Sequence, residues 1–112
     1  MRLFTYRRAG LSAVFVLAMI PVSGWAQNAG ESLYRIKCTL CHGPDGSGSS
    51  LGKKMKVHDL RSPEVQKMSD TDLTYIISNG KNNMPPFKSK LSPEQMPQVL
   101  NYVRELGKKK QP

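Results

Sequence analysis

The chain has 112 residues, with 17 lysines and arginines against 8 aspartates and glutamates, and a formal net charge of +9. This length accommodates one domain. A hydrophobic fraction of 38% with 22% charged residues excludes an intrinsically disordered chain and a protein with several membrane spans.

Residues 1–26 have the pattern of a secretory signal peptide. Three arginines precede an apolar run at residues 11–20, and small residues lead from this run to Ala26. The run is shorter than the roughly 20 residues that span a membrane. We therefore expect cleavage after about Ala26 and export to the periplasm, leaving residues 27–112 as the only domain; a retained N-terminal anchor is the alternative. Cleavage removes three arginines and no acidic residue, which lowers the net charge from +9 to +6.

The first helix is expected to begin at Asn28, a residue type that caps helices, and to run to about Cys41. It leads into a Cys-x-x-Cys-His motif at residues 38–42, which contains both cysteines of the chain. Three kinds of site share such cysteines: a redox-active dithiol, a zinc site completed by His58, and covalent attachment of haem. The dithiol needs a parallel sheet around it and zinc needs a second ligand pair, and the sequence offers neither.

Covalent attachment of haem explains every residue of this motif. Cys38 and Cys41 are three residues apart, so a helical turn places their thiols on one side, where both can bond to one porphyrin. His42 follows directly and can bind the iron through its imidazole. A bound haem would also supply apolar surface to a domain that is otherwise small for stable folding.

The next elements are a loop and two helices. Residues 43–54 are rich in glycine and serine and are expected to form a loop along one edge of the haem. Ser62 and Pro63 predict the start of a short helix. Ser69 predicts the N-cap of a second helix, which Gly80 ends.

The sixth ligand of the iron has five candidates: Met55, Met68, Met84, Met96 and His58. Met84 is preferred because it stands in a segment with neither helical nor strand pattern and precedes two prolines, which stiffen the backbone. The other methionines are expected to fill the core or to lie at the surface, and the histidine to lie in a surface loop.

The last helix has the clearest pattern. Ser92 and Pro93 provide a cap and a first-turn proline, and Gln95 completes a capping box. An apolar stripe at helical spacing follows, and Gly107 is expected to end the helix. Because no strand pair or internal repeat is visible, the predicted fold class is all-α.

These residues resemble class I c-type cytochromes over residues 28–106. The resemblance rests on Gly30, Leu33 and Tyr34 before the Cys-x-x-Cys-His motif, on Met84-Pro85-Pro86-Phe87, and on Leu91-Ser92-Pro93-Glu94 before Tyr102. It implies a bundle of about 4–5 short helices wrapped around one covalent haem c. It also implies close approach of the first and last helices near Gly30 and Tyr102.

The resemblance also implies the roles of the site residues. Cys38 and Cys41 would form the thioether bonds to haem, and His42 and Met84 would be the axial ligands of the iron. The carbonyl of Pro44 would accept a hydrogen bond from the ring of His42 and fix its tautomer.

Filled axial positions predict a single-electron carrier that is not an enzyme and has no catalytic residues, because no substrate reaches the iron. Two alternatives remain open. The chain could be the cytochrome subunit of a larger dehydrogenase or oxidase, or a haem enzyme or gas sensor whose sixth ligand is labile.

The partners are expected from the charge. Six lysines occur in the loops on either side of the motif and in the Met84 segment: Lys53, Lys54, Lys56, Lys81, Lys88 and Lys90. They favour a redox partner protein with an acidic docking surface. Export makes nucleic acid an unexpected partner, and a membrane is expected only if the N-terminal segment is retained.

Overall fold

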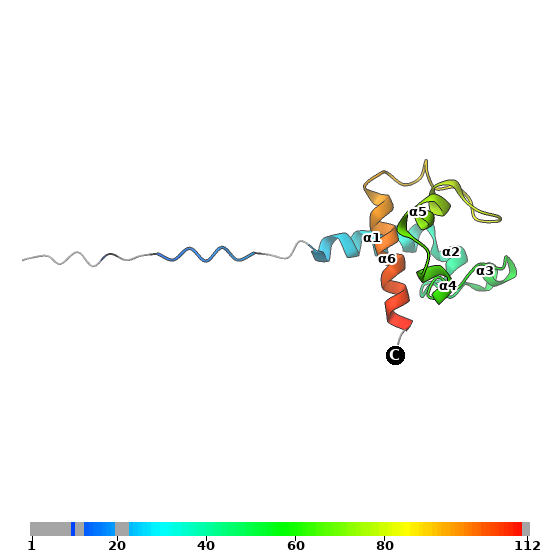
Figure 1. The fold of residues 1–112 in the computed structure, drawn as a ribbon, viewed down its shortest axis with the longest axis horizontal. Helices are drawn as coiled ribbons and strands as arrows, with labels where there is room; N and C mark the ends of the chain where they lie inside the picture. Colours follow the sequence, from blue (N-terminus) through cyan, green and yellow to red (C-terminus); the bar gives the residue numbers. More distant parts are fainter. Residues whose placement is uncertain (1–9, 11–12, 20–22, 111–112) are drawn as a thin grey trace, which may run out of the picture.

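The computed structural model describes residues 10, 13–19 and 23–110, and the described part folds into helices without a strand. The six helices are α1 (Ser23–Lys37), α2 (Thr39–His42), α3 (Ser50–Lys54), α4 (Pro63–Gln66), α5 (Asp70–Asn79) and α6 (Gln95–Lys110) (Figure 1). The all-α prediction is confirmed. The expected 4–5 helices become six because a single residue, Cys38, separates α1 from α2, and because α3 adds one turn.

The N-terminal segment contributes nothing to the helical bundle where it is described. Residues 13–19 form neither helix nor strand, and their larger apolar side chains are exposed. The arginines of the expected signal peptide lie outside the described residues, and the expected cleavage point after Ala26 falls inside α1. None of the helices in the described ranges is long and apolar enough to cross a membrane.

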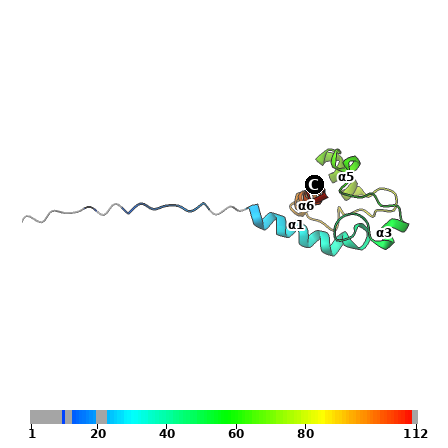
Figure 2. The same ribbon diagram turned by 90° about the horizontal axis from the view of Figure 1, so that it is seen from below.

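The main contact between helices is the crossing of α1 and α6, which the two ribbon views show from perpendicular directions (Figures 1 and 2). Gly30 permits it, because a Cβ at this position would collide with the carbonyl oxygen of Gln98 and lie 3.3 Å from the Cβ of Tyr102. The rings of Tyr34 and Tyr102 meet at the crossing with centroids 5.2 Å apart. The close approach expected between Gly30 and Tyr102 is therefore confirmed.

Serine caps begin most of the other helices. The hydroxyls of Ser62 and Ser69 accept hydrogen bonds from backbone N–H groups three residues later, as expected. Before α6, the Ser92 hydroxyl accepts from the Gln95 N–H at 3.1 Å, and the Gln95 side chain accepts from the Ser92 N–H at 3.0 Å. These reciprocal bonds confirm the predicted capping box.

Three boundaries differ from expectation. Asn28 lies inside α1, which begins at Ser23. The expected loop at 43–54 contains α3, capped by Ser49. Gly107 does not end α6, which continues to Lys110. This glycine is buried, and a Cβ there would collide with the side chain of Gln66, so its role is to permit close packing and not to terminate the helix.

The core consists of three clusters of buried side chains built around α6. One joins α1 to α6, one joins α6 to the segment after α5, and one joins α6 to α4 and α5. Helix α3 lies at the edge of the domain in both ribbon views. The space between the clusters is the site described next.

Candidate functional site

An apolar cleft opens between the end of α1, the α5 helix and α6. Cys38, His42 and Met84, three of the four predicted site residues, line it. The rest of the lining comes from aromatic and aliphatic side chains: Tyr34, Leu60, Val65, Leu73, Ile76, Ile77, Val99 and Val103. Segments that lie more than 40 residues apart in the sequence thus place a thiol, an imidazole and a thioether at one cleft.

The cysteine motif forms one turn of helix at the mouth of this cleft. The N–H of Cys38 donates to the carbonyl of Tyr34 at 2.8 Å, and the N–H of His42 donates to the carbonyl of Cys38 at 2.9 Å. Both cysteines are half-buried free thiols. Burial raises the pKa of Cys38 to about 11, so in the folded chain this sulfur stays protonated and is a poor nucleophile.

His42 has the state that an iron ligand requires. Burial lowers the pKa of its imidazole, which favours the neutral form whose ring nitrogen can bind a metal. Its Nδ1 is buried and makes no hydrogen bond to any described residue. The bond expected from this ring to the Pro44 carbonyl is therefore not formed in this structure.

Met84 is held by a tight turn of its own backbone. Its N–H donates to the carbonyl of Lys81 at 2.9 Å, and the N–H of Lys81 donates back to the Met84 carbonyl at 3.1 Å. Asn82 in this turn has a φ of 53°, and Gly80 before it has a φ of 75°. The half-buried Met84 side chain packs against the cluster formed by Phe87 and its neighbours.

The other candidate ligands lie elsewhere. Met96 is buried in the core and Met68 packs against the cluster around α4. Met55 follows α3, outside the cleft lining. The His58 side chain is 64% exposed and lies 3.7 Å from Glu64. Within the described ranges no group of His, Cys, Asp and Glu could hold a metal ion, so the zinc site finds no support.

Tyr34 is a residue of the site to which the sequence analysis gave no role in binding, although it contributed to the family resemblance. Its side chain is fully buried, and its hydroxyl donates to the carbonyl of Gly43 at 2.7 Å. Burial raises the pKa of this phenol far above its usual range, so it remains a donor. The clue in the sequence was its place four residues before Cys38, one helical turn away.

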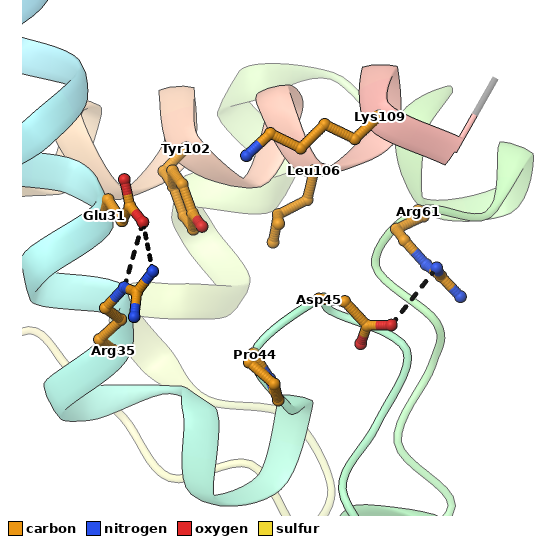
Figure 3. Close-up of a pocket in the computed structure, with 8 residues that line it drawn as sticks. All are labelled: Glu31, Arg35, Pro44, Asp45, Arg61, Tyr102, Leu106 and Lys109. Carbon is orange, nitrogen blue, oxygen red and sulfur yellow. Dashed lines mark hydrogen bonds and ion pairs between the residues drawn. The ribbon is translucent and has the colours of Figure 1, made fainter. Parts of the chain in front are cut away.

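A second, charged pocket of about 370 Å³ lies beside Tyr102 and Leu106 of α6 (Figure 3). Arg35 pairs with Glu31 at 2.6 Å and Arg61 approaches Asp45 at 3.5 Å. The ammonium of Lys109 lies 5.6 Å from the centre of the Tyr102 ring. None of the four predicted haem-binding residues lines this pocket, although Pro44 does.

The residues of the apolar cleft fit a haem. The cleft supplies an apolar lining, a neutral imidazole with a buried and unbonded ring nitrogen, a thioether and a thiol. These are the donors that c-type haem uses for its covalent and axial bonds. A helical domain with such a site defines a class, the small haem proteins that transfer electrons.

Comparisons with known proteins agree with this assignment. Residues 26–103 match the family described as "Cytochrome C oxidase, cbb3-type, subunit III". Cytochrome c6 of Pyropia yezoensis is 32% identical over 107 residues, covering 88% of this chain and 94% of the relative. The subunit CcoP of the cbb3-type oxidase of Rubrivivax gelatinosus is 34% identical over 101 residues, covering 84% of this chain but 30% of the relative.

A solved structure of a c-type cytochrome is also similar to this chain. The KustC0563 c-type cytochrome has a TM-score of 0.65 and 35% identity, and the match covers 69% of this chain and 95% of that one. The chain belongs to this family of c-type cytochromes. Its cofactor is one covalently bound c-type haem.

Proposed function

We propose that this protein is a single-electron carrier in which Cys38 and Cys41 hold haem c covalently and His42 and Met84 are the axial ligands of its iron. The observation that carries the proposal is the cleft, which brings Cys38, His42 and Met84 together from two distant segments. The relatives named cytochrome c6 support the carrier role.

The side chains of the cleft suit this role. When bound, haem supplies a reversible one-electron change at its iron. The imidazole of His42 and the thioether of Met84 would fill both axial positions and keep substrates from the metal. A neutral thioether favours the ferrous state and raises the potential. The backbone turn at residues 81–84 would hold that sulfur in place, so the segment would not need to become ordered when the sulfur binds the iron.

The proposal includes the location of the carrier. Residues 1–26 would be a signal peptide cleaved after about Ala26, and residues 27–112 would form the periplasmic cytochrome domain. The glycine and tyrosines that pack α1 on α6 all lie after the cleavage point, so processing would leave the helix crossing intact.

The redox partner would carry an acidic docking surface. The six lysines are all exposed: Lys53 and Lys54 in α3, Lys56 shortly after it, and Lys81, Lys88 and Lys90 in the segment that contains Met84. Their charge would steer an acidic protein toward this side of the domain.

A second candidate function is electron transfer within a larger complex. The family description and the CcoP relative both name a subunit of a cbb3-type oxidase. The size of the native protein in a periplasmic extract separates the two: a free carrier migrates as one small domain, whereas a subunit migrates with a complex.

The test of the carrier is Met84→Ala, with Met68→Ala as the control because Met68 is also half-buried but lies outside the cleft lining. Loss of the thioether should abolish the weak long-wavelength band of a sulfur–iron bond, lower the potential and permit carbon monoxide binding to the ferrous protein. The control should retain the parent spectrum. If the parent itself binds carbon monoxide readily, the closed carrier site is wrong and a haem enzyme or gas sensor takes its place.

A further inference from the structure

Tyr34 bonds to both ends of the Cys-x-x-Cys-His turn. Its backbone carbonyl accepts from the N–H of Cys38 at 2.8 Å and from the hydroxyl of Thr39 at 3.3 Å. Its side-chain hydroxyl donates to the carbonyl of Gly43 at 2.7 Å. One residue therefore fixes the start of the turn through its backbone and the end of the turn through its side chain.

The side chain that makes these bonds is itself fixed. Tyr34 has 0% exposure and its ring packs against that of Tyr102 at the crossing of α1 and α6. The approach of the two helices at Gly30 leaves no room for a shift. The turn is thus tied to the main contact between helices in the described part of the chain.

The carbonyl that receives the hydroxyl belongs to the residue directly after His42. Gly43 has a φ of 75° and a ψ of 164°, where the chain reverses out of α2. Its carbonyl also accepts from the N–H of Gly46, at a longer 3.3 Å. The phenol is therefore the nearer of its two donors, and it sets the plane of the peptide that leaves the histidine.

We propose that Tyr34 is a positioning residue for His42: its hydroxyl fixes the backbone that follows the imidazole and so holds the orientation of the ring. This inference rests on the proposed function, because it concerns His42 as the iron ligand. The Nδ1 of a metal-bound histidine is the atom through which surrounding groups tune the ligand. In this chain that atom is buried within the segment that Tyr34 holds.

Two variants that each remove one hydroxyl test the proposal in the haem-loaded protein. Tyr34→Phe removes the bond to Gly43 and keeps the ring, whereas Tyr102→Phe removes the other hydroxyl of the same ring pair. In Tyr34→Phe, the NMR resonance of the His42 Nδ1–H should shift and its exchange with water should become at least about tenfold faster. The midpoint potential should rise, because a less firmly oriented imidazole is a weaker donor to iron.

The control Tyr102→Phe should leave the Nδ1–H resonance and the potential at their parent values. If the two variants lose stability alike and neither shifts the Nδ1–H signal, Tyr34 is a packing residue and the proposal is overturned. Both readouts are independent of electron-transfer activity.

A measurement on the parent protein covers the case in which Tyr34→Phe does not fold. The hydroxyl proton of Tyr34 and the Nδ1–H of His42 should exchange with water at matching rates once each is corrected for its own intrinsic exchange rate, because one opening of the turn releases both. Rates that differ more than about tenfold would overturn the proposal. The absorption spectrum of the parent tests haem ligation separately, so failure of the proposed function is recognised before either proton is measured.

Discussion

Asp45 shows how a single exposed side chain can order the loop that follows His42. Its carboxylate accepts from the N–H of Ser47 at 2.9 Å and from the Ser47 hydroxyl at 2.7 Å. These bonds, with a smaller contribution from nearby Arg61, hold the pKa of Asp45 below its ordinary value of 3.8. The turn they form lies three residues after His42.

This lowered pKa predicts a pH dependence of stability. Between the folded and unfolded pKa values the unfolded chain binds the extra proton, so the stability contributed by Asp45 is present above pH 3.8 and is lost as the pH falls through the folded value. The parent should be more stable than Asp45→Asn at about pH 6, and this difference should shrink at about pH 3. Denaturant unfolding of both proteins at the two pH values measures it.

Ser47→Ala removes the donor and keeps the carboxylate, so it should reduce the same pH dependence. If Asp45→Asn is less stable than the parent by the same amount at both pH values, the carboxylate bonds do not control the loop.

Single residues also show the limit of prediction from the sequence. Met84 could be predicted because the prolines after it act locally on the backbone. The role of the Tyr34 hydroxyl could not, because its acceptor is a carbonyl nine residues away and the pairing depends on burial of both groups. The same holds for Gly107, whose packing partner Gln66 lies in another helix.

Among the helices, the crossing of α1 and α6 determines the geometry of the site. Gly30 is the point of closest approach, and Tyr34 projects from the next turn of α1 into the cleft. Any change that separates the two helices therefore also moves the end of α1, from which the cysteine turn continues.

Gly30→Ala should destabilise the protein. Alanine is favoured over glycine in helices by about 1 kcal/mol, but the added Cβ would collide with the Gln98 carbonyl, and such overpacking costs about 1–3 kcal/mol. The collision with backbone should prevail, because the backbone of α6 cannot rotate away. The midpoint of thermal unfolding of the haem-loaded protein measures the change.

Ser32→Ala is the matched control, because Ser32 is exposed on the same helix. It should alter stability by no more than about 0.5 kcal/mol. A Gly30→Ala protein as stable as this control would mean that the crossing has room to relax.

The helices themselves were predicted best where their signals are local. Ser62, Ser69 and the Ser92–Gln95 pair act within one turn and were found from the sequence. Helix α3 was missed because the glycines, serines and proline of residues 43–54 favour a loop. What stabilises it is tertiary, since Gly52 packs directly on the Cys41 carbonyl and the Ser49 hydroxyl donates to the Leu40 carbonyl.

For the molecule as a whole, the cleft makes the fold dependent on its cofactor. Aliphatic side chains from four segments line it, and a haem bound among them would add its own apolar surface to the core. Burial of apolar surface contributes roughly 25 cal/mol per Å². The surface buried against a group as large as haem would therefore supply a large share of the stability of so small a domain.

Replacing Cys38 and Cys41 with serine should therefore leave no haem on the chain after denaturing electrophoresis, and the chain should lose most of its helical circular dichroism. A double variant that remains helical and folds cooperatively without haem would contradict this dependence.

The charge of the molecule predicts its kinetics with small redox reagents. Lys88 is exposed in the segment after Met84, whereas Lys108 is exposed near the far end of α6. Lys88→Gln should slow oxidation by an anionic reagent such as hexacyanoferrate more than Lys108→Gln does. Both rates should fall as salt screens the charges. Equal effects of the two substitutions would mean that electron transfer does not occur near the Met84 segment.

The pairing of α1 with α6 also has a consequence for the order of events during biosynthesis. The first helix cannot bury its face until the last one has been synthesised, so the fold closes late and over a long loop. Until then the thiols of Cys38 and Cys41 would be open to the haem attachment that we propose for them. Afterwards Cys38 is half-buried, with its pKa at about 11. The order of folding would therefore require haem to be attached before α6 packs on α1.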